Sequence, residues 1–296
     1  MNRRHFISKS AALFVSGCIA SRQAYASPLL AAQLNKGRIG IQLFSVRAKL
    51  SEDFVGTLQK LSDIGYSSIE PYGFREDAFF NYSMKELSDI VKDMDMVISG
   101  VHTRSAILPA DTNAKEWDFW KKCADSIKSG GGKWAIHAGY PGAESVDDLK
   151  RIAEHFNRVG EVCEKAGVKF AYHNNYVEFN KIDGEVILDY IIRNTDPKLV
   201  SFQLDMGHVV YGGGDCMRYL RDFRGRFALW HASDVDAESK EHREVGKGSV
   251  PFAQMFEIAE ASGLEQLIVE QETGSDILAS CKVDFDYLKQ YKWTQA

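Results

Sequence analysis

Short apolar runs alternate with amphipathic stretches along most of the chain, and the pair repeats eight times after residue 38. Nearly continuous apolar runs indicate strands that are covered on both faces, whereas apolar positions with helical spacing indicate helices that bury one side. The predicted strands span residues 39–46, 67–71, 96–101, 133–137, 168–173, 199–206, 227–233 and 267–271. This strict alternation predicts an α/β protein with a parallel sheet.

Several predicted helices begin and end at recognisable signals. Ser51 precedes the apolar positions of the first helix, and Gly65 follows the last of them. The sequence Ser83-Met84-Lys85-Glu86 is a capping box, in which two side chains bond free backbone amides of the first turn. Gly167 ends the helix before the fifth strand, because glycine readily adopts the left-handed conformation of a helix terminus.

Two folds have this order of elements, an open doubly wound sheet and a closed barrel. The strand and helix units within residues 37–293 match the size of a (β/α)8 TIM barrel. The phosphate loop of a dinucleotide-binding sheet is absent after the first strand, and Gly212-Gly213-Gly214 after the sixth lacks its spacing. Because no internal linker or repeat interrupts the pattern, we expect a single-domain (β/α)8 barrel over residues 37–293.

The first 26 residues have the features of a bacterial export signal. A basic pair, Arg3-Arg4, precedes an apolar run over residues 11–20, and Ala24-Tyr25-Ala26 is a typical cleavage site. The segment resembles twin-arginine signals, which a transporter reads as an address. An alternative is a lipobox over residues 15–18, in which Cys18 becomes the lipidated first residue. The apolar run is too short for a membrane span, so we expect a periplasmic protein or a membrane-anchored lipoprotein.

Charge and cysteine content narrow the class of partner. The chain has 36 basic and 41 acidic residues and a formal net charge of −5, which does not suit a nucleic-acid partner and argues against a nuclease. A small molecule is the expected partner. The cysteines beyond the signal lack the close spacing of a zinc knuckle or a redox pair, and we expect them to be buried; they are Cys123, Cys163, Cys216 and Cys281.

Acidic residues and histidines follow the apolar run of seven of the eight predicted strands. They are Glu70, His102, His137, His173 with Asn174 and Asn175, Asp205 with His208, His231 with Asp234, and Glu270 with Glu272. The carboxyl ends of barrel strands meet at one rim, where the active sites of this fold lie. A buried unpaired charge costs several kcal/mol, so these groups must face water, one another or a metal ion.

The alternation of side chains along the late strands supports a metal site. Gln203 and Asp205 share one face of the sixth strand, and Leu229 and His231 share one face of the seventh. A single histidine at a strand end is more often a structural residue. Two carboxylates and an imidazole from consecutive strands, however, form an N/O ligand set that suits Mn²⁺, Co²⁺, Zn²⁺ or Mg²⁺.

Four motifs of the late strands resemble those of the xylose-isomerase-like sugar isomerase/epimerase family. They are Leu204-Asp205-Met206-Gly207-His208, Leu229-Trp230-His231-Ala232-Ser233-Asp234, Arg243-Glu244-Val245-Gly246-Lys247-Gly248-Ser249-Val250 and Val269-Glu270-Gln271-Glu272. Residues 40–45 and 171–175 extend the resemblance over nearly the whole mature chain. It implies a (β/α)8 barrel that holds one divalent metal ion at its mouth, with Asp205, His231 and Glu270 as ligands.

The chain departs from this family at the fifth strand. Many epimerases of the family have a glutamate there that is both a metal ligand and a proton shuttle, whereas this chain has His173-Asn174-Asn175. The subgroup that it resembles more often has a second histidine where Asn175 stands. The fourth ligand is therefore His173, Asn175 or a water molecule, with Glu178 on the following loop.

A cation chelated by the carbonyl and a neighbouring hydroxyl of a sugar stabilises the enediolate that forms when the adjacent carbon loses a proton. The candidate bases are His137, His173, Glu270 and Glu272. The candidate substrate contacts are Glu70, His102, His208 and Arg243, and a surface ion pair is the alternative for the arginine.

Export favours a non-phosphorylated sugar, since sugar phosphates are mainly intracellular. If the enediolate is reprotonated, the reaction is an isomerisation or an epimerisation, and the protein is a metal-dependent sugar isomerase or epimerase. If the enediolate instead expels a group from the β carbon, the reaction is an elimination, and the alternative function is that of a lyase acting on a 3-keto-glycoside. A barrel that has lost its chemistry and serves as a carbohydrate-binding lipoprotein is the other alternative, and the missing glutamate of the fifth strand supports it.

Overall fold

The computed structural model describes residues 38–73, 78–103 and 114–295. The predicted export signal over residues 1–26, with its alternative lipidation site at Cys18, lies outside the described residues. Within the described ranges, no helix combines the length and the hydrophobicity that a membrane span requires. The four cysteines that we expected to be buried are buried, and no disulfide joins them.

Nine parallel strands of the described chain form a nearly closed barrel. Their spatial order is β5 (Val97–Ile98), β2 (Ser68–Glu70), β1 (Ile39–Gln42), β15 (Gln266–Val269), β12 (Leu229–Ala232), β11 (Val200–Asp205), β8 (Lys169–His173), β7 (Trp134–Ala138) and β6 (Gly100–Thr103). Every predicted strand has a counterpart among them, so the predicted single-domain TIM barrel is confirmed.

The ninth strand arises because the third predicted strand is split into β5 and β6. Ser99 lies between the two pieces and donates hydrogen bonds from its amide and its hydroxyl to the carbonyl oxygen of Ile69. Beyond this bend, His102 donates its amide to Pro71 O at 2.8 Å and accepts from Gly73 N at 2.9 Å. These two hydrogen bonds join β6 to the chain after β2 and close the barrel.

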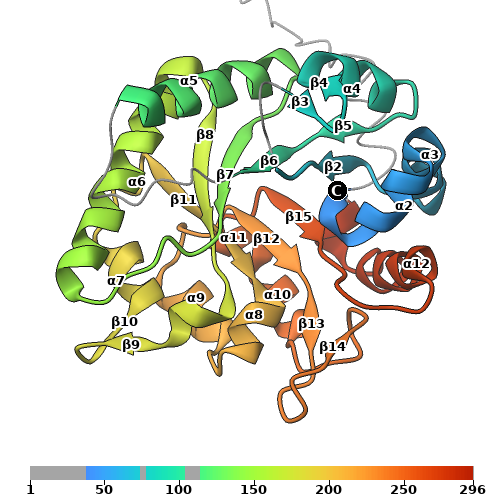
Figure 1. Cartoon of the computed structure of the whole chain (residues 1–296). Coiled ribbons are helices and arrows are strands. Elements are labelled where there is room, and N and C mark those ends of the chain that lie inside the picture. Colours follow the sequence, from blue (N-terminus) through green and yellow to red (C-terminus); the bar gives the residue numbers. More distant parts are fainter. Residues whose placement is uncertain (1–37, 74–77, 104–113, 296) are drawn as a thin grey trace, which may run out of the picture.

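Helices surround the strands (Figure 1). They are α2 (Arg47–Glu52), α3 (Phe54–Ile64), α4 (Met84–Lys92), α5 (Ala114–Ser129), α6 (Val146–Ala166), α7 (Ile187–Arg193), α8 (Met206–Tyr211), α9 (Cys216–Asp222), α10 (Phe252–Glu257), α11 (Ala259–Ser262) and α12 (Ile277–Leu288). Short 3-10 helices span Leu43–Val46 (η1), Tyr176–Phe179 (η3) and Lys292–Gln295 (η4). Three small hairpins are formed by β3 (Ala78–Phe79) with β4 (Tyr82–Ser83), β9 (Lys181–Ile182) with β10 (Glu185–Val186), and β13 (Asp234–Val235) with β14 (His242–Arg243).

The helix signals read from the sequence are mostly confirmed. The capping box opens α4 at Ser83, and Gly65 and Gly167 end α3 and α6 with positive φ angles of 123° and 79°. The start of α3 differs from the prediction, because Asp53 caps it by accepting from Gly56 N at 2.9 Å. Ser51 lies in α2 instead. The first strand is also shorter than predicted, since the chain turns into η1 after Gln42.

The inside of the barrel has an apolar floor and a polar upper layer. The floor is a small cluster of buried side chains from β7, β8, β12 and the residue that precedes β12. They are Trp134, Ile136, Ala171, Ala228 and Leu229. Two residues further along their strands, His173 and His231 take the positions above Ala171 and Leu229. The polar layer therefore lies at the carboxyl ends of the strands, where the sequence predicted the site.

Candidate metal centre

Four side chains from neighbouring strand ends meet in this upper layer. His173 ends β8, Asp205 ends β11, His231 lies in β12 and Glu270 follows β15. Each offers one ligand atom, and these four atoms all lie within 4.8 Å of one another. Nε2 of His173 is 3.5 Å from Oδ2 of Asp205 and 3.6 Å from Oε2 of Glu270. Nδ1 of His231 is 3.8 Å from the same aspartate oxygen and 2.7 Å from the same glutamate oxygen.

The unsatisfied atoms of this group fit a bound cation. Oδ2 of Asp205 and both ring nitrogens of His173 are buried, and none has a hydrogen-bond partner of normal geometry among the described residues. Most buried polar atoms in proteins have a partner, because losing contact with water is otherwise costly. Two imidazoles and two carboxylates form a ligand set for Zn²⁺, Mn²⁺ or Co²⁺, and the pattern predicted from the sequence is present as a compact candidate metal site.

Asp205 is fixed by contacts that leave Oδ2 facing this site. Its other oxygen, Oδ1, accepts from His208 N at 2.7 Å and from the Ser233 hydroxyl at 2.6 Å. Its backbone exchanges two hydrogen bonds with the side chain of Asn174, at 3.1 Å and 3.2 Å. No role was predicted from the sequence for Ser233 or Asn174, although both lie next to predicted site residues.

His231 is held from behind by Glu70. Nε2 of the imidazole lies 2.7 Å from Oε1 of Glu70, which is fully buried. Two glutamines complete the surroundings of this carboxylate, with Nε2 of Gln42 at 2.8 Å from Oε1 and Nε2 of Gln203 at 2.9 Å from Oε2. A histidine that binds a metal commonly donates its other ring proton to a carboxylate, which fixes the ring and its tautomer.

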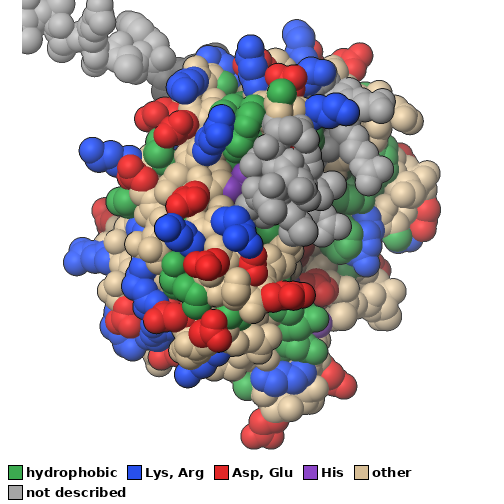
Figure 2. Space-filling model, turned by 60° about the vertical axis from the view of Figure 1, so that its left-hand side comes forward, with side chains coloured by type: hydrophobic (Ala, Val, Ile, Leu, Met, Phe, Trp, Pro, Cys, Tyr) green, Lys and Arg blue, Asp and Glu red, His purple; other side chains and the backbone are tan. Residues whose placement is uncertain are grey.

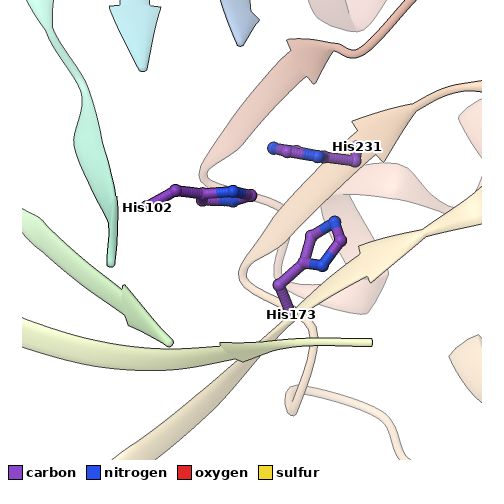
Figure 3. A group of neighbouring side chains, drawn as sticks. All are labelled: His102, His173 and His231. Atoms are coloured by element: carbon purple, nitrogen blue, oxygen red, sulfur yellow. The ribbon is translucent and has the colours of Figure 1, made fainter. Parts of the chain in front are cut away.

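His102 belongs to the same layer of contacts. Its Nε2 atom lies 2.6 Å from Oε1 of Gln203 and 3.0 Å from Oε1 of Glu70. Its ring stacks on that of His231 at a centroid distance of 4.9 Å, and Figure 3 shows these two rings and His173 facing a common space. We predicted Glu70 and His102 as substrate contacts. The structure corrects this prediction for Glu70, which is fully buried and has both carboxylate oxygens engaged. His102 offers a ring nitrogen that lies within 4.8 Å of ring nitrogens of His173 and His231, so it is a further candidate ligand, and its role as a substrate contact stays a prediction.

The pKa values of the group follow from its mixture of charges. Burial lowers the pKa of His231, but the carboxylates of Glu70 and Glu270 outweigh burial and raise that pKa to about 10. Burial likewise opposes the contacts of His173 with Asp205 and Glu270, which raise the pKa of His173 to about 9. Burial raises the pKa of Asp205, yet His208 and His173 bring it down to about 2. Without a metal ion, the two imidazoles therefore hold protons that a cation would displace.

A second group of polar side chains lies at the rim. Oε1 of Glu272 is 3.8 Å from Nε2 of His208, and Oε2 is 3.4 Å from Nε2 of His242. The His208 ring lies 6.0 Å from the His173 ring, so this group adjoins the candidate ligands. Burial raises the pKa of Glu272. His208 and Glu272 thus lie beside the candidate ligands. His242 was not predicted from the sequence, because it lies in a hairpin and not at a barrel-strand end.

Three predicted site residues lie elsewhere. The His137 ring packs on Trp120, Phe156 and Tyr172, on the side of β7 that faces α5 and α6. This corrects its prediction as a base, because Ile136 takes the inward position. Arg243 is exposed on β14 and donates to Glu241 at 2.6 Å, which is the surface ion pair of the alternative interpretation.

Asn175 does not join the candidate ligands either. Strand β8 ends at His173, and Asn175 caps the following 3-10 helix η3. Its backbone amide and its side-chain amide both donate to Oε1 of Glu178, at 3.0 Å and 3.4 Å. The prediction of Asn175 as a ligand is therefore corrected, and His173 is the side chain that the fifth strand contributes.

Comparison with known proteins places this site in a family. Residues 58–291 match the model of the xylose isomerase-like TIM barrel family. The chain belongs to this family. The family includes enzymes that modify sugars and related compounds, and the resemblance stated from the sequence is confirmed.

Individual relatives differ in how much of the chain they match. The inosose dehydratase of Clostridium perfringens is 30% identical over 108 residues, which are 36% of this chain and 35% of the relative. The chain thus spans about a third of the length of this curated relative. A sugar phosphate isomerase/epimerase from Parabacteroides distasonis has a crystal structure that matches with a TM-score of 0.79 at 27% identity, over 87% of this chain and 96% of that protein.

A more distant structure has the same fold. The IOLI protein, whose crystal structure contains a bound zinc atom, matches with a TM-score of 0.67 at 12% identity, over 86% of this chain and 99% of that protein. At this identity the likeness shows the fold alone.

Proposed function

We propose that the protein is a divalent-metal-dependent enzyme that removes a proton from a carbon next to the carbonyl of a non-phosphorylated sugar. The observation that carries this proposal is the meeting of four ligand atoms from His173, Asp205, His231 and Glu270 within 4.8 Å of one another. The similarity to sugar-modifying relatives supports it.

The four side chains would hold the metal ion, which, when bound, polarises the sugar carbonyl and stabilises the negative charge of the enediolate. Glu70 keeps the His231 ring oriented toward the ion, and Ser233 does the same for Asp205. This support prevents the ligands from rotating away when the substrate enters.

Glu272 is the base that the geometry favours. Its side chain is 31% exposed, whereas that of Glu270 is 11% exposed and belongs to the candidate ligands. A carboxylate at the rim can take the proton from the sugar carbon and return it to the neighbouring carbon, which gives isomerisation. His208 and His242, which flank the carboxylate, orient it and contact substrate hydroxyl groups. Epimerisation would need a second acid that returns a proton to the opposite face of the enediolate.

Elimination is the second candidate outcome, and the similarity to inosose dehydratases favours it. The same enediolate can expel a group from the β carbon, such as water or the oxygen-linked part of a 3-keto-glycoside. His208 lies next to Glu272 and can protonate the departing oxygen while the carboxylate takes the carbon-bound proton.

The charge of the mouth favours a neutral substrate. Glu272, which is not among the candidate ligands, would repel a phosphate group at close range. Acidic and basic side chains are also intermixed on the face of the molecule in Figure 2, without a continuous basic patch there for a polyanion. We further propose that the protein acts outside the cytoplasm, as a periplasmic enzyme or as a lipoprotein anchored through Cys18, because residues 1–26 resemble an export signal.

The proposal is tested by proton exchange. The purified protein is incubated in D₂O with a panel of free ketoses and 3-keto-sugars, and deuterium entering a carbon next to the carbonyl is followed by NMR. We expect exchange that Asp205→Ala and His231→Ala abolish and that Asp222→Ala, a change to an exposed aspartate on α9, leaves intact.

Metal content supplies the second readout. Protein that holds no divalent ion, and takes up none on incubation, would contradict the enzyme proposal and support the non-catalytic carbohydrate-binding alternative. Exchange that survives in both site variants would contradict the ligand assignment.

A further inference from the structure

Five side chains just outside the candidate metal site form a closed ring of neighbours. We call this group the aromatic wall; its members are Tyr176, His208, Tyr211, His242 and Glu272. The Tyr176 ring lies 6.0 Å from His208 and 4.8 Å from Tyr211. The Tyr211 ring lies 6.2 Å from His242, at an interplanar angle of 25°. Glu272 completes the group through its contacts with both histidines, at 3.4 Å and 3.8 Å.

Four separate segments at the mouth of the barrel supply this wall. Tyr176 lies in η3 after β8, His208 and Tyr211 lie in α8 after β11, His242 lies in β14, and Glu272 follows β15. These are the same neighbouring strands whose ends supply the candidate ligands. The wall therefore borders the metal site on the side of β8, β11, β12 and β15.

The wall extends beyond the reach of the metal ligands. His208 lies between the candidate ligands and the tyrosines of the wall, since its ring is 6.0 Å from the ring of His173 and 6.0 Å from the ring of Tyr176. Tyr176 is 46% exposed, one of the few large apolar side chains of the described chain that are so open to solvent. A sugar held by the metal ion would contact His208 and Glu272, which leaves the two tyrosines for a group attached to that sugar.

The structure holds the wall in place before any ligand arrives. Lys240 lies 5.8 Å from the centre of the Tyr211 ring and donates to Val210 O at 3.3 Å. The hairpin that carries His242 is fixed by Asp234, whose carboxylate accepts four backbone amides of its own strand and of the loop after the hairpin. A preformed surface loses less conformational freedom on binding, which favours affinity.

We propose that the aromatic wall binds a second ring, joined through a glycosidic oxygen to the sugar at the metal site, so that the substrate is a glycoside whose metal-bound sugar ring carries a keto group. This inference rests on the proposed function. The rings of exposed Tyr176 and half-buried Tyr211 can pack on the apolar face of a ring, and the imidazoles and the carboxylate can bond hydroxyl groups at its edge. Both a second sugar and an aromatic aglycone have this chemistry. Glu272 would repel a phosphate group at the same place.

The test compares glycosides that share one sugar. Methyl and phenyl glycosides of glucose, galactose and mannose, in both anomers, and the disaccharide cellobiose are titrated into the protein, and dissociation constants are measured by calorimetry or by saturation-transfer NMR. We expect at least one phenyl glycoside, or cellobiose, to bind about three- to tenfold more tightly than its methyl counterpart. A preference for cellobiose identifies a second sugar, and a preference for phenyl glycosides identifies an aromatic aglycone.

The variants tie this preference to the wall. Tyr176→Ala and Tyr211→Leu should remove it while leaving the affinity for the methyl glycoside unchanged. Phe80→Leu, which removes an exposed aromatic ring on the β3–β4 hairpin, serves as the matched control and should retain it. Tyr176 is exposed, so its replacement leaves the fold intact, and a melting curve checks both variants.

The titration measures binding and does not depend on turnover. The glycoside inference and the proposed enzymatic function can therefore be contradicted independently of each other. If no member of the panel prefers the larger group, or if the preference survives in both tyrosine variants, the inference is wrong even when proton exchange is present. If the preference depends on the tyrosines but no exchange occurs, the proposed function is wrong and the wall remains a binding site.

Discussion

His231 and Glu70 form a buried pair in which Nε2 of the imidazole lies 2.7 Å from Oε1 of the carboxylate. Each of the two side chains is fully buried, and the opposite ring nitrogen, Nδ1, faces the candidate metal site. Glu70 ends β2, and β1 and β15 lie between this strand and β12. The pair therefore links a candidate metal ligand to a strand that is not a neighbour of its own.

Replacing Glu70 by glutamine should therefore weaken metal binding without removing a ligand. The amide keeps the volume of the side chain but loses the negative charge that stabilises the N–H of His231. We expect the metal affinity to fall about 10- to 100-fold, as for other partners behind metal ligands. Competition with a chromophoric chelator measures this. Glu265→Gln, at the opposite end of β15, is the control, and an affinity equal to that of the parent protein would show that Glu70 does not support His231.

Metal binding should become tighter as the pH rises from 6 to 9. The pKa values of His173 and His231 are raised to about 9 and about 10, so both rings hold protons in the metal-free protein over this range. A cation must displace these protons, and the free protein therefore binds more protons than the loaded one. Calorimetry in buffers with different heats of ionisation should show proton release on zinc binding. Binding that is independent of pH over this range would contradict the assignment of the two histidines.

Ionisation of Asp284 should make the folded protein less stable above neutral pH than it is at acidic pH. Burial raises its pKa to about 7 from the ordinary value of 3.8, although it accepts from Val245 N at 2.7 Å. Between these two values the folded state binds more protons than the unfolded state, so the stability that the group contributes is present below pH 4 and is lost as the pH rises through about 7.

Asp284→Asn removes this ionisation. At pH 8 the variant should be more stable on the order of 3 kcal/mol, and at pH 4 the two proteins should be nearly equal. Urea unfolding at the two pH values measures the difference. A variant that is equally or less stable than the parent at pH 8 would contradict the raised pKa.

His137→Phe should leave metal binding and proton exchange intact, because the ring lies among aromatic side chains on the helix-facing side of β7. His173→Phe, the matched change on the neighbouring strand, should reduce both by at least tenfold, since it removes a ligand. The two variants are compared by metal titration and by deuterium incorporation. Loss of exchange in the His137 variant, with its metal content unchanged, would restore His137 as a base.

The sequence was sufficient for the strands and for the residues that meet at the rim. Apolar runs mark β7, β8 and β12 because both faces of these strands are covered, and the acids and histidines follow because the runs end at the mouth. The orientation of each side chain is a finer question. A shift of one residue reverses the face, which is why His137 points outward while His173 points inward.

Other features depend on contacts between distant segments. Glu70 follows an apolar run, as a substrate-binding residue at a strand end would. Only the structure shows that its two oxygens already bond the side chains of Gln42, Gln203 and His231. The break at Ser99 lies within an apolar run, so no local signal marks it. His242 reaches the rim through a hairpin whose length and course the apolar pattern does not encode.

The junction between β2 and β6 has a mechanical consequence for the site. His102 uses its backbone to join the two edges of the barrel and its imidazole to contact Glu70. Any transient separation of these edges would therefore also disturb the support of His231. By linkage, an ion that binds only the closed arrangement must lower the population of the open one, and the amides of His102 and Gly73 should exchange with solvent more slowly in the loaded protein.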